Sequence, residues 1–349
     1  MAAIEKLYDF IDRKWFVRDL KENSIGHIKI ALVREVVNPL IIRSTDMEAT
    51  ITLVTADGRE LVEIPPRKLK SKEKLLGLML CREFKVVDEK VRYNVFEGAE
   101  MLNNPNSALF GDTSTKSGDT AGLTSRAIYD WAYSLRDVKD ITDKLQHNAL
   151  SEAGTMIDEA TGEMRQSLYS TEYILPGTLF PHFITVDNIT PELFIHLLSC
   201  VVNQHRYGAQ TTTNANNMIN HLIAIGFADF EKPINSYTVS KAWNGITQKD
   251  APTLESINTF VNEQMKKHYQ EDGLVKNLVD LVKWVDDLWK EKDKPSLKEI
   301  YTSAQKSVDE YLKKIKMVKE SAGDKKQKGA KKGKETKAEA GNENTSPES

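Results

Sequence analysis

The sequence is poor in cysteine and lacks any long hydrophobic run. Cys81 and Cys200 are the only cysteines among 349 residues, and both lie in apolar contexts far apart in the chain. This pattern excludes a cysteine-based zinc site and indicates two reduced, buried thiols in a cytoplasmic protein. No apolar run approaches the roughly 20 residues needed to cross a membrane, and the N-terminal stretch is charged. We therefore expect no membrane contact and no secretion signal.

The common catalytic motifs are also missing. There is no G-x-S-x-G elbow, no H-E-x-x-H motif and no G-x-G-x-x-G after an expected strand. The segment 112–120 has the hydroxyls of a phosphate-binding loop but lacks its Gly-Lys-Ser/Thr order, which argues against nucleotide hydrolysis. Its Ser114 and Lys116 are candidates for contact with a sugar-phosphate backbone. An unrelated metabolic enzyme would need clustered acids or His, and the seven His are scattered.

Net positive charge is absent as well, because the formal net charge is −3. This value argues against indiscriminate binding to nucleic acid. Positive charge is nevertheless concentrated in 65–92, which holds nine Lys or Arg against four Asp or Glu, a local excess of five. The nine are Arg67, Lys68, Lys70, Lys72, Lys74, Arg82, Lys85, Lys90 and Arg92. The segment is either a phosphate-facing surface or an ordinary solvated helix face.

The most distinctive stretch is 205–230, where a polar, uncharged loop rich in Gln, Thr and Asn leads into the apolar run 222–230. That run is typical of a buried strand. A helix is expected before the loop, with Thr190 as N-cap and Pro191 at its first position. A polar loop attached to a core strand suits a long ligand that is held along its backbone. The alternative is a plain connection with Asn-rich turn chemistry.

The first third of the chain predicts a helix over 4–22 and a core strand over 27–37. The Asp-Gly pair at 57–58 predicts a hairpin, and a short helix is expected near 73–82. Residues 94–125 show no periodic pattern and predict a long functional or mobile loop.

Residues 126–146 fit either strand or helix, and 147–176 predict a long hairpin. Met156 lies near its tip, where an apolar side chain can interrupt stacked bases. Three helices are expected over 253–270, 273–291 and 296–319, the last with a capping box from Ser296 to Glu299. The mildly basic tail 321–349 has no aromatic residue and predicts disorder.

Asp46 is the most interesting single acid, because it follows Arg43 at a polar interruption between two apolar runs. A carboxylate on an exposed loop beside a cation can hold a divalent ion or activate a hydroxyl. An Asp in a turn is the plain alternative.

Four segments occur in an order and spacing that resemble the backbone subunits of type I-D CRISPR Cascade complexes. These subunits form part of the Cas-seven-type branch of the repeat-associated RAMP proteins. The segments are NALSEAGTM (148–156), LPGTLFP (175–181), RYGAQT (206–211) and NHLIAIGFAD (220–229). The resemblance covers roughly residues 8–243 and is strongest in 147–231.

The resemblance implies an α+β fold with an RRM-like (ferredoxin-like) palm over 1–250. Finger (about 56–125) and thumb (about 140–176) elements would be inserted in this palm, followed by a helical subdomain at 251–320. Copies would stack head-to-tail along a CRISPR guide RNA together with other Cascade subunits. The thumb would displace guide nucleotides at intervals, and the spaced guide would pair with target DNA or RNA.

The resemblance and the residue patterns together define a predicted RNA-binding set. Its members are Arg43, Lys68, Lys70, Lys72, Arg82, Ser114, Lys116, Met156, Arg206, Tyr207, Gln210, Thr211, Asn214, Asn220 and His221. Some relatives carry a Cys cluster, suggesting zinc, before the pair that matches Phe110 and Gly111. This chain has Asn103-Asn104-Pro105-Asn106 there, so we expect its finger to be ordered differently, by RNA or a neighbouring subunit.

Two functions remain open from the sequence. The first is a scaffold that binds guide RNA without chemistry or cofactor, which we favour. The second is the same scaffold that also cuts the bound target, as related type III backbone subunits do with a loop Asp and a metal ion. Asp46 is the catalytic candidate in that case, and Mg²⁺ would be required.

Overall fold

The central element of the fold is a four-stranded antiparallel sheet in the order β11-β1-β10-β6. The computed structural model describes residues 2–43, 49–56, 58–116, 119–147, 162, 169–212, 214–244, 252–315 and 317. The four strands are β1 (His27–Val36), β6 (Ala127–Tyr129), β10 (Leu179–Asp187) and β11 (Met218–Ala228).

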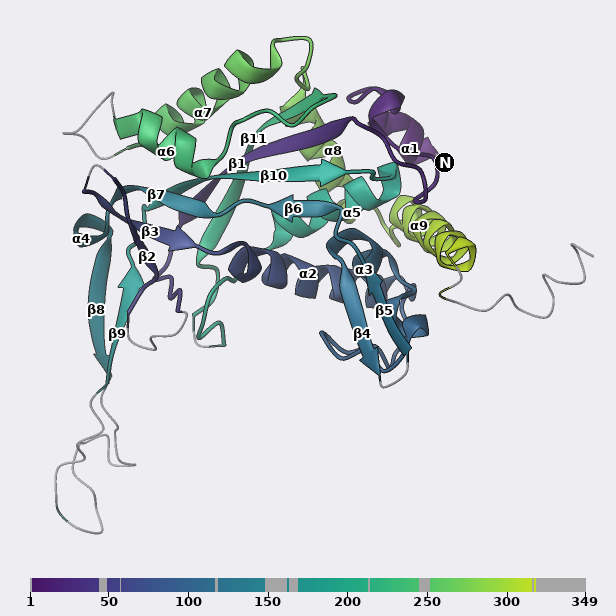
Figure 1. Cartoon of the computed structure of the whole chain (residues 1–349), viewed down its shortest axis with the longest axis horizontal. Helices are drawn as coiled ribbons and strands as arrows, with labels where there is room; N and C mark the ends of the chain where they lie inside the picture. The colour runs from purple at the N-terminus through teal and green to yellow at the C-terminus, as the bar shows by residue number, and fades with distance from the viewer. Residues whose placement is uncertain are drawn as a thin grey trace, which may run out of the picture.

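Two helices connect these strands in the ferredoxin-like βαββαβ pattern. Helix α2 (Pro66–Glu83) lies between β1 and β6 in the chain, and α5 (Pro191–Asn203) lies between β10 and β11. Each helix has a Pro at its start, where the missing N–H costs nothing. Both pack against each other and against the same sheet (Figure 1). The order of the strands and the position of the helices confirm the predicted palm.

Strand β1 is buried on both faces, which explains why its sequence shows an apolar run rather than strict alternation. Ile28, Ile30 and Leu32 belong to the core shared with α2 and α5. Ala31 and Val33 belong to a second core, formed with α6 (Ser236–Asn244) and α7 (Leu254–Tyr269). The predicted strand is therefore confirmed, and helices cover both faces of the sheet.

A smaller sheet and two hairpins extend from the palm. The smaller sheet is formed by β2 (Thr52–Val54), β3 (Glu60–Ile64) and β7 (Ala132–Asp137), next to the short α4 (Val138–Ile141). One hairpin pairs β4 (Asp112–Lys116) with β5 (Asp119–Leu123), and the other pairs β8 (Thr142–His147) with β9 (Tyr169–Ile174). Both hairpins project from the same side of the sheet, with α2 between them (Figure 1).

The second hairpin confirms the base of the predicted thumb, and the pairing of β2 with β3 confirms the predicted Asp-Gly hairpin. Met156 and most of the arm beyond β8 lie outside the described residues. Residues 126–146, which fitted either helix or strand, form β6, β7, the short α4 and most of β8.

The prediction of a structureless loop over 94–125 is wrong. This region contains η2 (Ala99–Leu102), α3 (Pro105–Phe110) and the β4–β5 hairpin. Asn104 caps α3 by accepting a hydrogen bond from Ser107 N at 2.8 Å, and Asn106 Nδ2 donates to Lys74 O at 3.0 Å. Elements this short show no periodicity. Contacts within the chain thus order the described part of this region, which was expected to be ordered by RNA or a neighbouring subunit.

Two predicted helices have other bounds. The helix expected over 4–22 is only α1 (Ala2–Leu7) plus the short η1 (Arg13–Trp15), because Asp12 caps a new turn by accepting from Lys14 N. The short helix expected near 73–82 begins at Pro66, so α2 carries most of the basic segment. Helix α6 had no counterpart in the sequence prediction.

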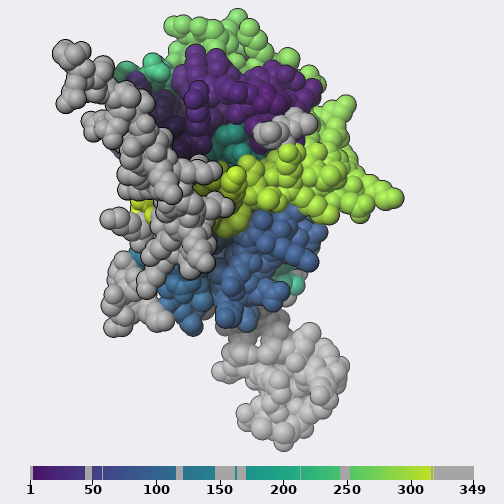
Figure 2. Space-filling view, turned by 90° about the vertical axis from the view of Figure 1, so that its right-hand side faces the viewer, coloured from purple at the N-terminus to yellow at the C-terminus, as the bar shows by residue number. Residues whose placement is uncertain are grey.

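The three C-terminal helices are confirmed as α7, α8 (Leu278–Lys290) and α9 (Pro295–Lys314). The capping box predicted for α9 is wrong, because Glu291 accepts from both Ser296 N and Ser296 Oγ. A capping box does exist at the start of α7. Helix α9 lies between the N-terminal segment and the finger region (Figure 2).

Both α8 and α9 share the core of α2 and α5. The domain limits themselves stay predictions, and the tail 321–349 lies outside the described residues. No helix in the described part is long and apolar enough to cross a membrane.

Candidate nucleic-acid interface

A charged side chain occupies the interior of the palm. Arg34 of β1 has no exposed surface, and its Nη1 donates to Glu73 Oε1 of α2 at 2.8 Å and to Asn220 Oδ1 of β11 at 2.8 Å. Burial alone would lower the pKa of Arg34, but the carboxylate of Glu73 more than offsets this effect. The net pKa is raised, so the guanidinium stays charged. A permanent buried charge therefore joins the sheet to α2.

Tyr207 completes this buried network. Its hydroxyl donates to Glu73 Oε1 at 2.7 Å and accepts from Asn220 Nδ2, also at 2.7 Å. Tyr129 of β6 donates to the other oxygen of Glu73. Burial and the nearby Glu73 carboxylate raise the pKa of Tyr207 and Tyr129 well above the ordinary value, so both remain neutral donors.

Tyr207 and Asn220 were predicted to bind RNA, and their positions do not fit direct contact. Tyr207 has no exposed surface, and Asn220 is 8% exposed with its amide donating to Val201 O at 2.7 Å. Their role in the structure is to hold the 205–217 loop onto α5 and β11. We name the buried residues Arg34, Glu73, Tyr129, Tyr207 and Asn220 the palm network.

Sequence reasoning missed Arg34 and Glu73. A charged residue within a strand as apolar as 27–37 was the available signal for Arg34. Glu73 was counted as one acid among many cations, although it lies on the buried face of α2. Neither signal indicates that the two side chains meet.

The 205–217 loop is fixed at both ends. Tyr207 N donates to Asn217 Oδ1 and Asn217 Nδ2 donates to Tyr207 O, both at 2.9 Å. Gly208 has a φ of +71°, and a Cβ at this position would lie 2.2 Å from Ile41 O. Only glycine lets Ala209 N reach that oxygen at 2.9 Å. The loop is therefore pinned to the segment that follows β1.

The loop leaves Arg206 exposed, while the other predicted residues here are more constrained. Gln210 and Thr211 are half-buried, and Gln210 has a φ of +53°. Asn214 Nδ2 donates to Pro39 O. His221, on β11, lies 2.8 Å from Glu35 Oε2. Arg206 is thus the predicted loop residue best placed to meet phosphate.

The cations of α2 separate into two groups. Lys68, Lys72 and Arg82 lie on the face opposite the buried side of the helix, and Arg82 Nη2 donates to Val91 O at 2.9 Å. Lys70 points to the other side, where its Nζ donates to Ser125 Oγ at 2.6 Å and burial lowers its pKa to about 8. Lys74 pairs with Asp112 and donates to Gly111 O at 2.9 Å. Lys70 therefore helps attach the segment around Ser125 to α2, which does not fit its predicted role as an RNA contact.

Of the remaining predicted residues, Arg43 and Ser114 are placed by the structure. Arg43 Nη2 donates to Thr171 Oγ1 of β9 at 3.1 Å, which directs it toward the thumb hairpin. Ser114 is fully buried and its hydroxyl lies 3.3 Å from Phe96 O, so direct RNA contact does not fit. Asp46 and the side chain of Lys116 lie outside the described part.

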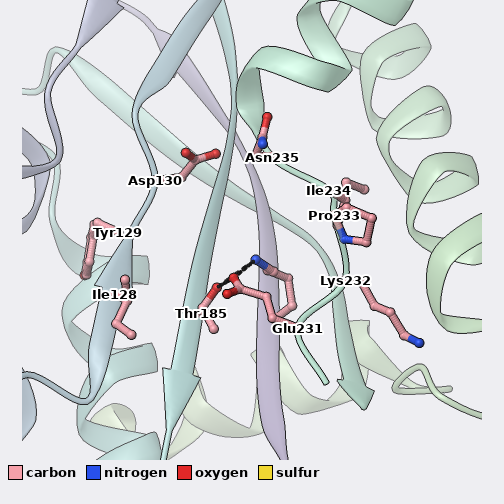
Figure 3. A pocket seen from close by; sticks show the side chains of 10 residues that line it. Ile128, Tyr129, Asp130, Thr185, Glu231, Lys232, Pro233, Ile234 and Asn235 are labelled. Atoms are coloured by element: carbon pink, nitrogen blue, oxygen red, sulfur yellow. Dashed lines mark hydrogen bonds and ion pairs between the residues drawn. The ribbon is translucent and has the colours of Figure 1, made fainter. Parts of the chain in front are cut away.

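A hollow of about 430 Å³ lies on the opposite face of the sheet (Figure 3). Lys29 lines the hollow, and its Nζ donates to Glu231 Oε1 at 2.6 Å and to Thr185 Oγ1 at 2.7 Å. The Lys29 charge is thus already compensated, and no residue of the predicted RNA-binding set lines the hollow. Across the described residues, no group of three or more His, Cys, Asp or Glu is arranged to hold a metal ion.

The two cysteines, far apart in sequence, are free and buried, as predicted. Cys81 is on α2 and Cys200 is on the neighbouring α5. Burial raises the pKa of Cys81 to about 12 and that of Cys200 well above its ordinary value. Both thiols are therefore protonated and unreactive.

The fold and this surface define a class: a ferredoxin-like palm with two projecting hairpins and a polar loop that is fixed at both ends and exposes an arginine. The chain belongs to the Csc2 Crispr family, whose profile matches residues 16–328. No curated protein sequence matches the chain significantly.

Three solved structures are similar to this chain, and the first of them shows the same fold. The crystal structure of Thermofilum pendens Csc2 matches with a TM-score of 0.58 at 14% identity, over 87% of this chain and 95% of that chain. A chain of a CRISPR RNA-guided surveillance complex, pre-nicking, matches with a TM-score of 0.46 at 10% identity, over 69% and 89%. A chain of a CRISPR RNA-guided surveillance complex matches with a TM-score of 0.42 at 11% identity, over 68% and 84%.

Proposed function

We propose that this chain is the backbone subunit of a type I-D CRISPR effector complex. It binds the guide RNA, stacks head-to-tail with further copies along it and presents the guide for pairing with a target strand. The observation that carries the proposal is the fixed 205–217 loop, which holds Arg206 at the surface in a chain of the Csc2 family.

The chemistry of the surface fits an RNA backbone better than a defined base sequence. Arg206 and the outward cations Lys68 and Lys72 of α2 supply charge for phosphates. Hydroxyl and amide groups of the 205–217 loop supply hydrogen bonds to sugars. Such contacts position a strand without reading its sequence, as a subunit repeated along a variable guide requires. A net charge of −3 is compatible with this role, because only one surface has to be positive.

The proposal predicts that charge reversal on α2 weakens RNA binding. In the variant Lys68→Glu/Lys72→Glu, affinity for a guide-length single-stranded RNA should fall roughly tenfold or more. The slope of log affinity against log salt should decrease by about one for each lost phosphate contact. Fluorescence anisotropy across a salt series measures both quantities.

The matched control is Lys267→Glu, a charge reversal at an exposed position of α7 on the other side of the sheet. It should leave affinity and slope unchanged. If Lys68→Glu/Lys72→Glu binds RNA as the wild type does, the assignment of this surface is wrong.

A further inference from the structure

The outward face of α2 carries an ordered row of five residues, which we call the α2 stripe. They are Lys68, Lys72, Leu75, Met79 and Arg82, at intervals of four, three, four and three residues. These intervals keep side chains on one face of an α-helix. The residues at 69, 73, 77 and 81 form the buried side, so the stripe faces away from the core.

The middle of the stripe is apolar. Leu75 is 39% exposed and Met79 is 55% exposed, on a helix whose other leucines are buried (69 and 78) or half-buried (76 and 80). Single exposed apolar residues are common and need no explanation. Here, however, two such residues adjoin one turn apart, with lysines on one side and Arg82 on the other.

We propose that Leu75 and Met79 form a contact surface for unstacked RNA bases. Lys72 and Arg82 lie about 15 Å apart along the helix axis, from ten residues at 1.5 Å each. In this arrangement the two cations hold phosphates of one strand, and one or two bases between those phosphates lie against the Leu75 and Met79 side chains. The inference deepens the proposed function and rests on it.

Charge complementarity favours a nucleic acid as the occupant of the stripe. Three cations flank the apolar pair, whereas Glu83, the exposed acid of α2, has its Oε1 3.7 Å from Lys294 Nζ. A single-stranded RNA supplies both anionic phosphates and apolar base faces from one molecule. Because the methionine side chain is flexible and polarisable, it adapts to any base and requires no particular sequence.

The variant Leu75→Ser/Met79→Ser tests this surface, and both positions are exposed enough for the fold to tolerate the change. We expect affinity for single-stranded RNA to fall roughly five- to twentyfold, from the apolar area no longer buried. The salt slope should stay at the wild-type value, because no phosphate contact is removed. Thermal unfolding should be unchanged, and Val279→Ser, at an 81% exposed position of α8, is the matched control.

An abasic RNA of the same length provides the decisive comparison. The wild type should bind it more weakly than normal RNA, and the serine double variant should lose much of that discrimination. If the wild type binds RNA while the double variant shows unchanged affinity and discrimination, the base-contact surface is overturned and the proposed function stands. If the wild type fails to bind RNA, both are overturned. If the double variant keeps its RNA affinity but self-associates less, the stripe contacts protein instead.

Discussion

At the scale of single residues, the main feature is a permanent charge inside the sheet. Arg34 is fully buried, and its Nε and Nη2 have no hydrogen-bond partner among the described residues. The fold tolerates this buried charge because Glu73 pairs with it, and removing Glu73 would leave the charge of Arg34 uncompensated. Tyr207 Oη and Asn220 Oδ1 also accept from Arg34 Nη1, at 3.2 and 2.8 Å, and the same two residues anchor the 205–217 loop.

Substitutions in the palm network should therefore lower the free energy of unfolding by different amounts. Glu73→Ala should lower the free energy of unfolding by about 3–5 kcal/mol, because Arg34 stays buried without a counter-ion. Tyr207→Phe should lower it by about 1–2 kcal/mol, the range for lost hydrogen bonds that include one to a charged group. Urea unfolding followed by circular dichroism measures both values.

The control is Tyr237→Phe, which removes a hydroxyl outside the palm network. Equal effects for Tyr207→Phe and Tyr237→Phe would contradict the bridging role of Tyr207. If Glu73→Ala lowered the free energy of unfolding by less than Tyr207→Phe does, the uncompensated charge of Arg34 would not be the dominant factor.

At the scale of elements, the close approach of a loop to the end of β1 positions the candidate interface. The 205–217 loop and the segment after β1 are joined through Val37 N to Asn217 O at 3.1 Å and Ala209 N to Ile41 O at 2.9 Å. Asn38 Nδ2 also donates to Asn216 O at 2.5 Å. Gly208 makes this approach possible, because any side chain there would displace the backbone of Ile41.

Gly58 and Gly208 both have a positive φ, but only Gly208 is crowded by neighbouring backbone. Substituting each with Ala therefore distinguishes the cost of backbone strain from the cost of displacing the Ile41 backbone. Gly58→Ala, at φ +80° with open space around it, should cost about 1 kcal/mol of stability from backbone strain alone. Gly208→Ala, at φ +71° with Ile41 O 2.2 Å from the new Cβ, should cost more and should also weaken RNA binding. Thermal unfolding and RNA anisotropy of both variants measure the difference. RNA affinity reduced equally by both would argue against a positioning role for Gly208.

The sequence predicted the long helices and strands better than the short ones, for a physical reason. Strand β1 and helix α5 were recognised because long buried elements impose an apolar pattern on the chain. Helix α3 and the β4–β5 hairpin were missed, because elements of five or six residues show too little of a period. Asn104 before Pro105 is a helix start signal in hindsight, since Asn is a favoured N-cap and Pro a favoured first residue.

At the scale of the whole molecule, the proposed assembly sets the relation between RNA length and copy number. If copies stack along the guide, the number bound should increase in steps of one as a single-stranded RNA is lengthened by a constant increment. Native mass spectrometry of the full chain with an RNA length series measures this number. A copy number that stays constant as the RNA grows would contradict head-to-tail stacking.

The alternative in which the scaffold also cuts its target depends on Asp46, which lies outside the described residues. If that alternative holds, reconstituted complex with Mg²⁺ and single-stranded target should give regularly spaced products, and Asp46→Ala should abolish them. EDTA provides the metal control, and Asp57→Ala, an acid between β2 and β3 in the chain, provides a matched substitution. No products from the wild type would leave the scaffold without chemistry of its own.

The sequence by itself determined the apolar core elements, the reduced thiols and the concentration of cations near α2, because composition and local periodicity follow directly from the chain. It also predicted a polar loop next to a core strand. Only the tertiary structure decided which polar side chains remain available to a ligand. Arg34 meets Asn220 across 186 residues of chain, and that contact turns two residues of the predicted RNA-binding set inward. Local sequence patterns do not reveal contacts between residues so far apart in the chain. Which polar side chains are buried and which are exposed to a ligand is therefore seen only in the folded molecule.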